Sequence, residues 1–454
     1  MGLPHVLALP YPAQGHVIPL MEVCNCLVDH GFKVTFVNTE FNHKRLLAAL
    51  STESTMEHIA LVSVPDGLGP EEDRSDHGSL TEAIVNVMPR CFLEELIEKS
   101  NETEDPMTCM LVDDSMGWAL EIGRKKGLRS AAFWPASAQL LATFLSIPEL
   151  VSRGVIDGDG TPIPEHETFQ LGPGMPFINA SHLVWNRYGD DRTKKLIFNH
   201  IVNNNRTIDV PEFIICNSFK ELEEPTFRYN PKILPIGPLV TSLRPNRAVA
   251  NFWPEDAACL SWLDEQQPGS VVYVAFGSFT IFGRRQFQEF ALGLEATGRP
   301  FLWVVRPDLT GDSADAYPDG FKERVGDRGK IVAWAPQQKV LAHPSVACFV
   351  SHCGWNSTME GVRNGKLFLC WPYFADQFLN QNYICDDWKV GLRMTPDESG
   401  IVKREQVKSK VEELLSNEEM RARASMLKEN AQRNINEGGA SFENLKTFMD
   451  AFKA

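Results

Sequence analysis

The chain has 454 residues, of which 43% are hydrophobic, and its formal net charge at pH 7 is −15. This length and composition are typical of a globular protein with two or three domains. The negative charge argues against nucleic acid as a partner, because binding to a phosphate backbone depends on an excess of cationic side chains. We expect the charge to serve solubility instead.

The cysteines and the apolar runs indicate the cellular compartment of the protein. Ten cysteines are scattered along the chain without a CxxC pair, which favours free thiols in a reducing compartment. The first residues, MGLPHVLALPYPAQG, lack the positive start of a secretory signal. The longest apolar stretch, 131–148, contains polar residues and is shorter than the ~20 residues of a spanning helix. We therefore expect a cytoplasmic protein without stable membrane insertion.

The first half of the chain alternates predicted strands with predicted helices. HVLALP (5–10) predicts a strand, and a loop and a helix with one apolar face follow it. Gly31 ends that helix, and KVTFV (33–37) predicts the next strand. Residues 110–112 and 213–216 predict further strands. This order of strand, helix and strand implies a parallel sheet.

A second series of strands begins near residue 270. Its members are short apolar runs at intervals that suit strand–helix units, namely VVYVAF (271–276), FLWVV (301–305), KIVA (330–333), ACFV (347–350) and LFLCW (367–371). Between the two series, residues 238–260 contain three prolines and no clear period. That stretch therefore predicts a connection between domains.

The chain is expected to form two doubly wound α/β domains. We place the first at 1–240, the connection at 241–260 and the second at 261–440. An apolar helical stripe within 441–454 is expected to pack back on the first domain. The Gly- and Pro-rich stretch 151–195 predicts a long irregular insertion. Ligands of such sheets bind beyond the carboxyl ends of the strands, so the loops there are the candidate sites.

The stretch SHCGWNSTMEG (351–361) follows one of these predicted strands. Gly354 lets a ligand approach the backbone closely, and Asn356 and Ser357 fall in the first turn of the next predicted helix. Unpaired N–H groups and the helix dipole favour an anion at that turn. Glu360 lies one turn further on the same face, where a carboxylate can accept hydrogen bonds from ribose hydroxyls. The arrangement suggests a site for a nucleotide diphosphate.

Other interpretations of these residues remain open. His352 could be a structural histidine, and Cys353 could be a nucleophile only if a base lay beside an exposed thiolate. A zinc site needs three or four ligands, and no second Cys/His pair has a suitable spacing.

The triplet Asp157-Gly158-Asp159, in a different part of the chain, resembles a metal motif, but turn chemistry in the irregular insertion explains it better. We expect no metal.

A longer window shows a family resemblance. Residues 334–377 read WAPQQKVLAHPSVACFVSHCGWNSTMEGVRNGKLFLCWPYFADQ. They closely resemble the signature box of plant secondary-product glycosyltransferases, UDP-sugar-dependent enzymes of glycosyltransferase family 1. That family has the GT-B fold, with two facing Rossmann-like domains. PYPAQGHVIPL near the start, FGS at 276–278 and EGGASFENL near the end are similar to further family landmarks, so the resemblance covers essentially the whole chain.

The resemblance implies a donor site in the second domain. Trp334 would stack on uracil, and the backbone near Ala335 and Gln337 would read the base and the ribose. Glu360 would hold the ribose hydroxyls. The residues expected to bind the diphosphate are Ser278, His352, Asn356 and Ser357, and those expected around the sugar are Trp355, Asp376 and Gln377. A final Gln in the box is usual in glucose-using members, so UDP-glucose is the expected donor, and no other cofactor is expected.

His16 is the candidate catalytic base. It lies where the first predicted helix begins, at the carboxyl end of the first strand, and a neutral imidazole there could take a proton from an acceptor hydroxyl. A structural histidine bonded to backbone is the alternative. The family pattern places the partner carboxylate at Asp113. Asp114 follows directly and leaves open which carboxylate meets His16, although alternation along the strand favours Asp113.

The expected function is inverting transfer of glucose from UDP-glucose to a small lipophilic acceptor, of phenolic, flavonoid or terpenoid type. The product would be a β-glucoside, with His16 as general base oriented by Asp113. Alternatives are another UDP-sugar, N- or C-glycosylation, a nucleotide-sugar epimerase and a non-catalytic UDP-sugar binder. A nicotinamide-dependent oxidoreductase is disfavoured because no GxGxxG follows a strand. The expected partners are the UDP-sugar and the aglycone, and the protein is expected to be a monomer.

Overall fold

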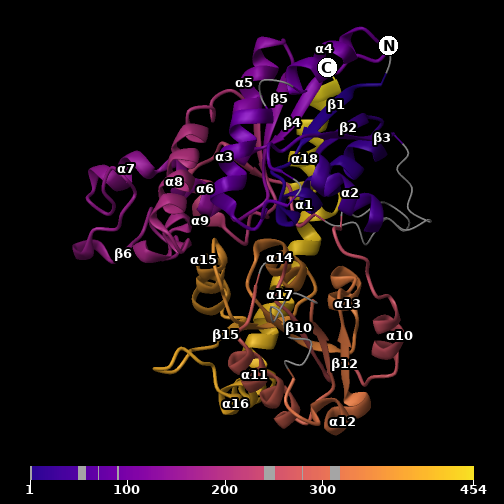
Figure 1. Cartoon of the computed structure of the whole chain (residues 1–454), viewed down its shortest axis with the longest axis vertical. Helices are drawn as coiled ribbons and strands as arrows, with labels where there is room; N and C mark the ends of the chain where they lie inside the picture. Colours follow the sequence, from indigo (N-terminus) through magenta and orange to yellow (C-terminus); the bar gives the residue numbers. More distant parts are fainter. Residues whose placement is uncertain are drawn as a thin grey trace. The chain divides into compact units, whose positions relative to one another are not determined.

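A computed structural model describes residues 3–49, 58–69, 71–88, 92–239, 251–278, 280–306 and 317–453. The chain divides into two compact units, Met1–Trp253 with Arg433–Ala454, and Pro254–Gln432 (Figure 1). Each unit is built on its own sheet and is described by itself. Within the connection expected at 241–260, residues 241–250 lie outside the described residues.

The first unit contains a seven-stranded sheet in the order β3-β2-β1-β4-β5-β8-β9, and its neighbouring strands are parallel. The strands are β1 (His5–Leu9), β2 (Lys33–Thr39), β3 (Ile59–Val64), β4 (Cys109–Asp113), β5 (Arg129–Trp134), β8 (Phe213–Cys216) and β9 (Ile233–Pro235). The order runs outward from β1 to β3 and then resumes at β4, on the other side of β1. The loops after β1 and β4 therefore lie at the topological switch point, where α/β sheets bind ligands.

Helices connect these strands. They are α1 (Gln14–Asp29), α2 (Glu40–Ala49), α3 (His77–Met88), α4 (Glu94–Asn101), α5 (Trp118–Lys125), α6 (Ala138–Leu145), α7 (Ile147–Ser152), α8 (Asp191–Asn205) and α9 (Glu224–Tyr229). Gly31, with φ of 83°, follows α1, as predicted. The stretch 151–195 is expected to be irregular. It holds the two-residue antiparallel strands β6 (Thr168–Phe169) and β7 (Ile178–Asn179), and single helical turns lie between β7 and the start of α8.

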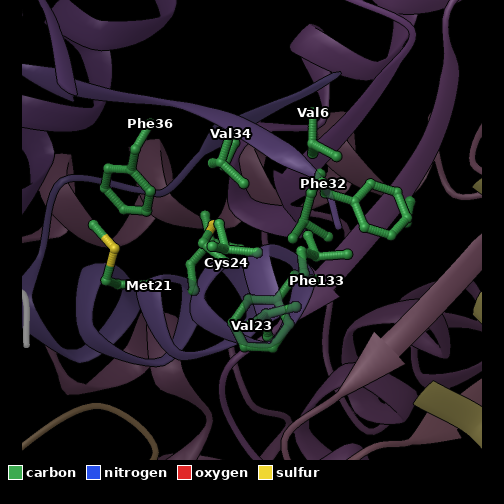
Figure 2. Packing of buried hydrophobic residues seen from close by; sticks show 14 of the residues in the cluster. Val6, Met21, Val23, Cys24, Phe32, Val34, Phe36 and Phe133 are labelled. Atoms are coloured by element: carbon green, nitrogen blue, oxygen red, sulfur yellow. The ribbon is translucent and has the colours of Figure 1, made fainter. Parts of the chain in front are cut away.

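The core of the first unit forms where α1 packs on the sheet. Figure 2 shows side chains of α1 gathered with those of the strands and of the turn between α1 and β2, and the labelled examples are Val6, Met21, Val23, Cys24, Phe32, Val34, Phe36 and Phe133. Each is at most 1% exposed, and full burial of such a side chain contributes ~1.5–3 kcal/mol. The C-terminal helix α18 (Ala440–Lys453) belongs to the same core, since the ring of Phe448 lies 5.8 Å from that of Phe213.

The second unit contains a six-stranded parallel sheet in the order β12-β11-β10-β13-β14-β15. The strands are β10 (Val271–Ala275), β11 (Phe301–Val304), β12 (Gly329–Val332), β13 (Val346–Ser351), β14 (Leu367–Cys370) and β15 (Gly391–Arg393). Five of them match the predicted strands to within one residue at each end. Here the switch point lies between β10 and β13.

The helices of the second unit are α10 (Ala258–Asp264), α11 (Arg284–Ala296), α12 (Phe321–Val325), α13 (Gln337–Ala342), α14 (Trp355–Arg363), α15 (Gln377–Asn382) and α16 (Arg404–Ser416), and α17 (Glu418–Ile435) leads back to the first unit. Within the parts of the chain that the structure describes, no helix combines the length and the apolar character needed to span a bilayer.

Candidate active site

The switch point of the first sheet brings His16 and Asp113 together. His16 lies in the first turn of α1, and Asp113 is the last residue of the neighbouring strand β4. Nδ1 of His16 lies 2.7 Å from Oδ2 of Asp113, and Oδ1 of the same carboxylate accepts the backbone N–H of Ser115 at 2.9 Å. The carboxylate is fully buried, whereas the imidazole is 28% exposed. A fixed acceptor therefore orients a ring that a ligand can still reach.

Asp114 does not make this contact, although the sequence left it as an alternative. Its side chain is buried, and its Oδ1 has no hydrogen-bond partner among the described residues. Burial, followed by the charge of Asp113, raises the pKa of Asp114 to about 7. The carboxylate that meets His16 is that of Asp113.

Three further polar side chains lie near His16, one from the loop just before α1 and two from distant parts of the chain. The ring of Tyr11 lies 5.2 Å from that of His16. Burial, and then the charge of His16, lowers the pKa of His77 to about 4. Nε2 of His200 lies 2.8 Å from the carbonyl oxygen of Ser115, the residue that also binds Asp113. None of the three was predicted as a site residue.

In the second unit, the predicted donor residues lie in loops at the carboxyl ends of the strands. Ser278 follows β10, Trp334 and Ala335 follow β12, Gln337 begins α13, His352 follows β13, and Asp376 and Gln377 follow β14. Asn356 and Ser357 lie in the first turn of α14, as predicted. Parallel strands end at one edge of their sheet, which gathers these residues there.

A hydrogen-bond network joins the residues assigned to ribose and diphosphate. The side-chain amide of Gln337 donates to Oε2 of Glu360 at 2.7 Å and to Oγ of Ser357 at 2.9 Å. The hydroxyl of Tyr273 donates to the carbonyl oxygen of the same amide at 3.0 Å, which fixes its orientation. Burial raises the pKa of Glu360 to about 7, against the opposing effect of hydrogen bonds from Gln337 and Gln338.

The ring of His352 is held between two glycines. A Cβ added at Gly277 would come within 2.6 Å of Nε2 of His352, and one at Gly354 within 2.5 Å. Gly277 also has φ of 69°, which favours glycine. Burial lowers the pKa of His352 to about 4, against the opposing effect of the Ala275 carbonyl. In the ligand-free protein the imidazole is therefore neutral near pH 7, and in this state it can offer an anion a hydrogen bond.

Comparison with known proteins identifies the family. A family model described as UDP-glucoronosyl and UDP-glucosyl transferase matches residues 255–430. UDP-glycosyltransferase 83A1 of Arabidopsis thaliana is 44% identical over 100% of this chain and 98% of its own length. The chain belongs to the plant family 1 UDP-glycosyltransferases. Linamarin synthase 1 of Manihot esculenta is 35% identical to this glycosyltransferase, over 98% of this chain and 96% of its own.

The solved structures agree with this glycosyltransferase along its whole length. UGT2 of Phytolacca americana, complexed with UDP-2fluoro-glucose and pterostilbene, is 26% identical and covers 99% of both chains with a TM-score of 0.81. A UDP-glucosyltransferase of Polygonum tinctorium, complexed with 3,4-dichloroaniline, gives a TM-score of 0.83 at 26% identity, over 100% of this chain and 99% of its own. The predicted family and the GT-B fold are both confirmed.

Three side chains of the predicted sugar site of this glycosyltransferase are already engaged. The indole of Trp355 is 3% exposed and packs against Tyr383 and Trp388. Oε1 of Gln377 accepts the backbone N–H groups of two residues of its own loop, at 2.7 and 3.0 Å. Oδ2 of Asp376 accepts the side-chain amide of Asn380 at 2.8 Å. The sugar contacts of all three therefore remain predictions.

Proposed function

We propose that this enzyme transfers glucose from UDP-glucose to a hydroxyl group of a small lipophilic acceptor, with inversion at the anomeric carbon. The observation that carries the proposal is the 2.7 Å contact between His16 and the buried carboxylate of Asp113. This pair is the arrangement that a general base requires, because the buried carboxylate fixes both the tautomer and the orientation of the imidazole.

The acceptor half of the reaction follows from this contact. The N–H group at Nδ1 of His16 donates a hydrogen bond to Asp113 and keeps its proton. The lone pair of the ring is therefore on Nε2, which can take the proton of an acceptor hydroxyl. The acceptor oxygen then forms a bond to the anomeric carbon as the bond from that carbon to the diphosphate oxygen breaks. UDP leaves with the electron pair, and Asp113 stabilises the imidazolium that has formed. Attack opposite an α-linked leaving group gives a β-glucoside.

The donor half of the proposal is supported by the second unit. Ser357 and Asn356 lie at the amino end of α14, where N–H groups and the helix dipole favour the diphosphate. Glu360 lies one turn further along α14 and accepts a hydrogen bond from Gln337, the first residue of α13; both side chains suit the ribose hydroxyls. The Phytolacca enzyme was solved with UDP-2fluoro-glucose, and the Polygonum protein is called a UDP-glucosyltransferase, which supports glucose as the sugar.

The experiment that tests the proposal is incubation of purified protein with UDP-glucose and a panel of phenolic, flavonoid and terpenoid alcohols. We expect UDP release only when an acceptor is present, and an NMR coupling constant of the product that reports a β-anomeric linkage. UDP release without an acceptor, an epimerised nucleotide sugar or an α-linked product would contradict the proposal. The same spectra distinguish O-glucosides from N- and C-linked products.

We expect UDP binding to weaken as the pH falls below about 7, because the pKa of Glu360 in the ligand-free protein is raised to about 7. Below that pH the carboxyl group is protonated, and it must lose its proton before it can accept two ribose hydroxyls. Well below pH 7 the affinity should fall by ~10-fold per pH unit. Calorimetric titration with UDP between pH 5.5 and 8.5 measures the effect. Glu360→Gln should bind UDP more weakly at pH 8 and lose this pH dependence. A wild-type affinity that is flat across pH 7 would contradict the role given to Glu360.

We expect EDTA to leave kcat unchanged. In the triplet 157–159, Oδ1 of Asp157 accepts the backbone N–H groups of Asp159 and Thr161 at 2.9 and 2.8 Å, and Asp159 lies 3.3 Å from Lys195. The triplet is thus a tight turn, as predicted; the carboxylate of Asp157 is engaged in that turn, and that of Asp159 is paired with Lys195 of α8. Assays with and without the chelator, with Mg²⁺ added back, check the expectation. Activity that EDTA abolishes and Mg²⁺ restores would show that a metal ion assists departure of the diphosphate.

A further inference from the structure

A buried arginine lies beneath the loop that carries Ser278. Arg306 follows β11 by two residues and is 2% exposed. One guanidinium nitrogen donates to the carbonyl oxygen of Gly277, and another donates to that of Thr280 at 3.1 Å. Gly277 and Thr280 flank Ser278, so one planar fork holds the backbone on both sides of a predicted diphosphate residue. Lysine, with a single nitrogen, lacks this fork.

The position of this backbone also determines how His352 is held. Gly277 lies against the imidazole so closely that a Cβ there would overlap it, and Arg306 donates to the carbonyl of that glycine. His352, in the loop after β13, thus lies against the loop after β10. Arg306 holds that loop after β10 through the carbonyl group of Gly277. The guanidinium charge acts on His352 as well, since it helps to lower the pKa of that ring.

The charge of Arg306 has a second consequence. The protein carries a formal net charge of −15, whereas a nucleotide diphosphate is itself an anion. His352 is neutral near pH 7 because its pKa is lowered to about 4. A guanidinium keeps its charge at any working pH, even when buried. Arg306 therefore places a permanent positive charge behind the backbone that faces the expected diphosphate.

We propose that Arg306 is a positioning residue for the donor diphosphate. It holds the carbonyl groups of Gly277 and Thr280, so that Ser278 and the ring of His352 stay in the geometry that binds the diphosphate, and its charge offsets that of the ligand and of departing UDP. This inference rests on the proposal that the second unit binds UDP-glucose. It goes beyond that proposal because Arg306 was not among the predicted site residues.

The test compares Arg306→Met and Arg306→Lys with Lys366→Met. Lys366 is a matched control, because it is also a buried cation of the second unit and donates to two carbonyl oxygens, of His343 at 3.2 Å and of Val346 at 2.7 Å. His343 precedes β13 and Val346 is its first residue, so both carbonyl groups lie at the amino edge of the sheet, away from the loops at its carboxyl edge. Lys366→Met should therefore lose thermal stability, as Arg306→Met does, without a change in UDP binding.

We expect Arg306→Met to bind UDP about 10- to 100-fold more weakly, the scale of lost hydrogen bonds to a charged group. The KM for UDP-glucose should rise and kcat should fall. Arg306→Lys retains the charge without the fork and should recover part of the affinity, which a purely structural role would not predict. Calorimetry measures the UDP affinity, and thermal melting confirms that each variant is folded. If Arg306→Met fails to fold, Arg306→Lys serves as the test, with an affinity expected below that of wild type.

Two outcomes would overturn the inference alone. One is wild-type UDP affinity in folded Arg306→Met or, where that variant is unfolded, in Arg306→Lys. The other is an equal loss of UDP affinity in Lys366→Met, which would show a general effect of destabilising the unit. Absence of UDP binding by the wild-type protein would contradict the proposed function itself, and this inference with it.

Discussion

Replacing His16 with alanine is expected to lower kcat by at least ~10²-fold, the usual scale for loss of a general base. Nδ1 of this ring is engaged by Asp113 at 2.7 Å, and the remaining nitrogen is the proton acceptor in the proposed reaction. UDP affinity should stay unchanged, because the predicted donor residues all belong to the second unit, whereas His16 belongs to the first. A non-catalytic UDP-sugar binder would show no change in either quantity.

His30→Ala is the matched control for this variant. His30 follows the last turn of α1, the same helix, and its Nδ1 lies 2.8 Å from the carbonyl oxygen of Cys26. It therefore reports any damage to α1 without touching the proposed site. Single-turnover assays of both variants, with UDP titrations alongside, make the comparison. Activity of His16→Ala close to that of wild type, or an equal loss in His30→Ala, would remove His16 from the mechanism.

Much of the fold could be predicted because buried parallel strands are continuous apolar runs. The strand ACFV, the loop after it and the helix that starts at Trp355 are contiguous, so local sequence was enough to place the amino end of α14. The same reasoning placed Glu360 one turn further along, where it meets Gln337. Where a site is built from one strand–loop–helix unit, helix geometry alone predicts which side chains lie together.

The rest of the site depends on contacts between distant segments. Tyr273 lies inside an apolar strand and Arg306 follows another, and nothing local shows that Tyr273 orients Gln337 or that Arg306 holds Gly277. His77 and His200 come from α3 and α8, whose packing the sequence pattern does not reveal. For Trp355, the sequence cannot distinguish a ring that faces a ligand from one packed in the core. Pairwise tertiary packing decides all of these cases.

Replacing Asp113 with asparagine is expected to lower kcat by roughly 10²–10⁴-fold while the fold is retained. The carboxylate uses one oxygen for His16 Nδ1 and the other for the backbone N–H of Ser115. An amide offers only one oxygen for these two donors. If that oxygen accepts from Ser115, the NH₂ group faces Nδ1, and the ring must carry its proton on Nε2, where it cannot take a proton from the acceptor.

The opposite orientation of the amide does not restore the site. It would return an acceptor to His16, but the NH₂ group would then face the N–H of Ser115, and a buried donor left without an acceptor costs ~1–3 kcal/mol. Asp114→Asn is the matched control, because Asp114 is an adjacent buried carboxylate that does not make the contact with His16, and this variant should retain most of the activity. The pH dependence of kcat and the thermal stability of both variants distinguish the two effects. A larger loss in Asp114→Asn than in Asp113→Asn would assign the partner of His16 to Asp114, against the geometry of the structure.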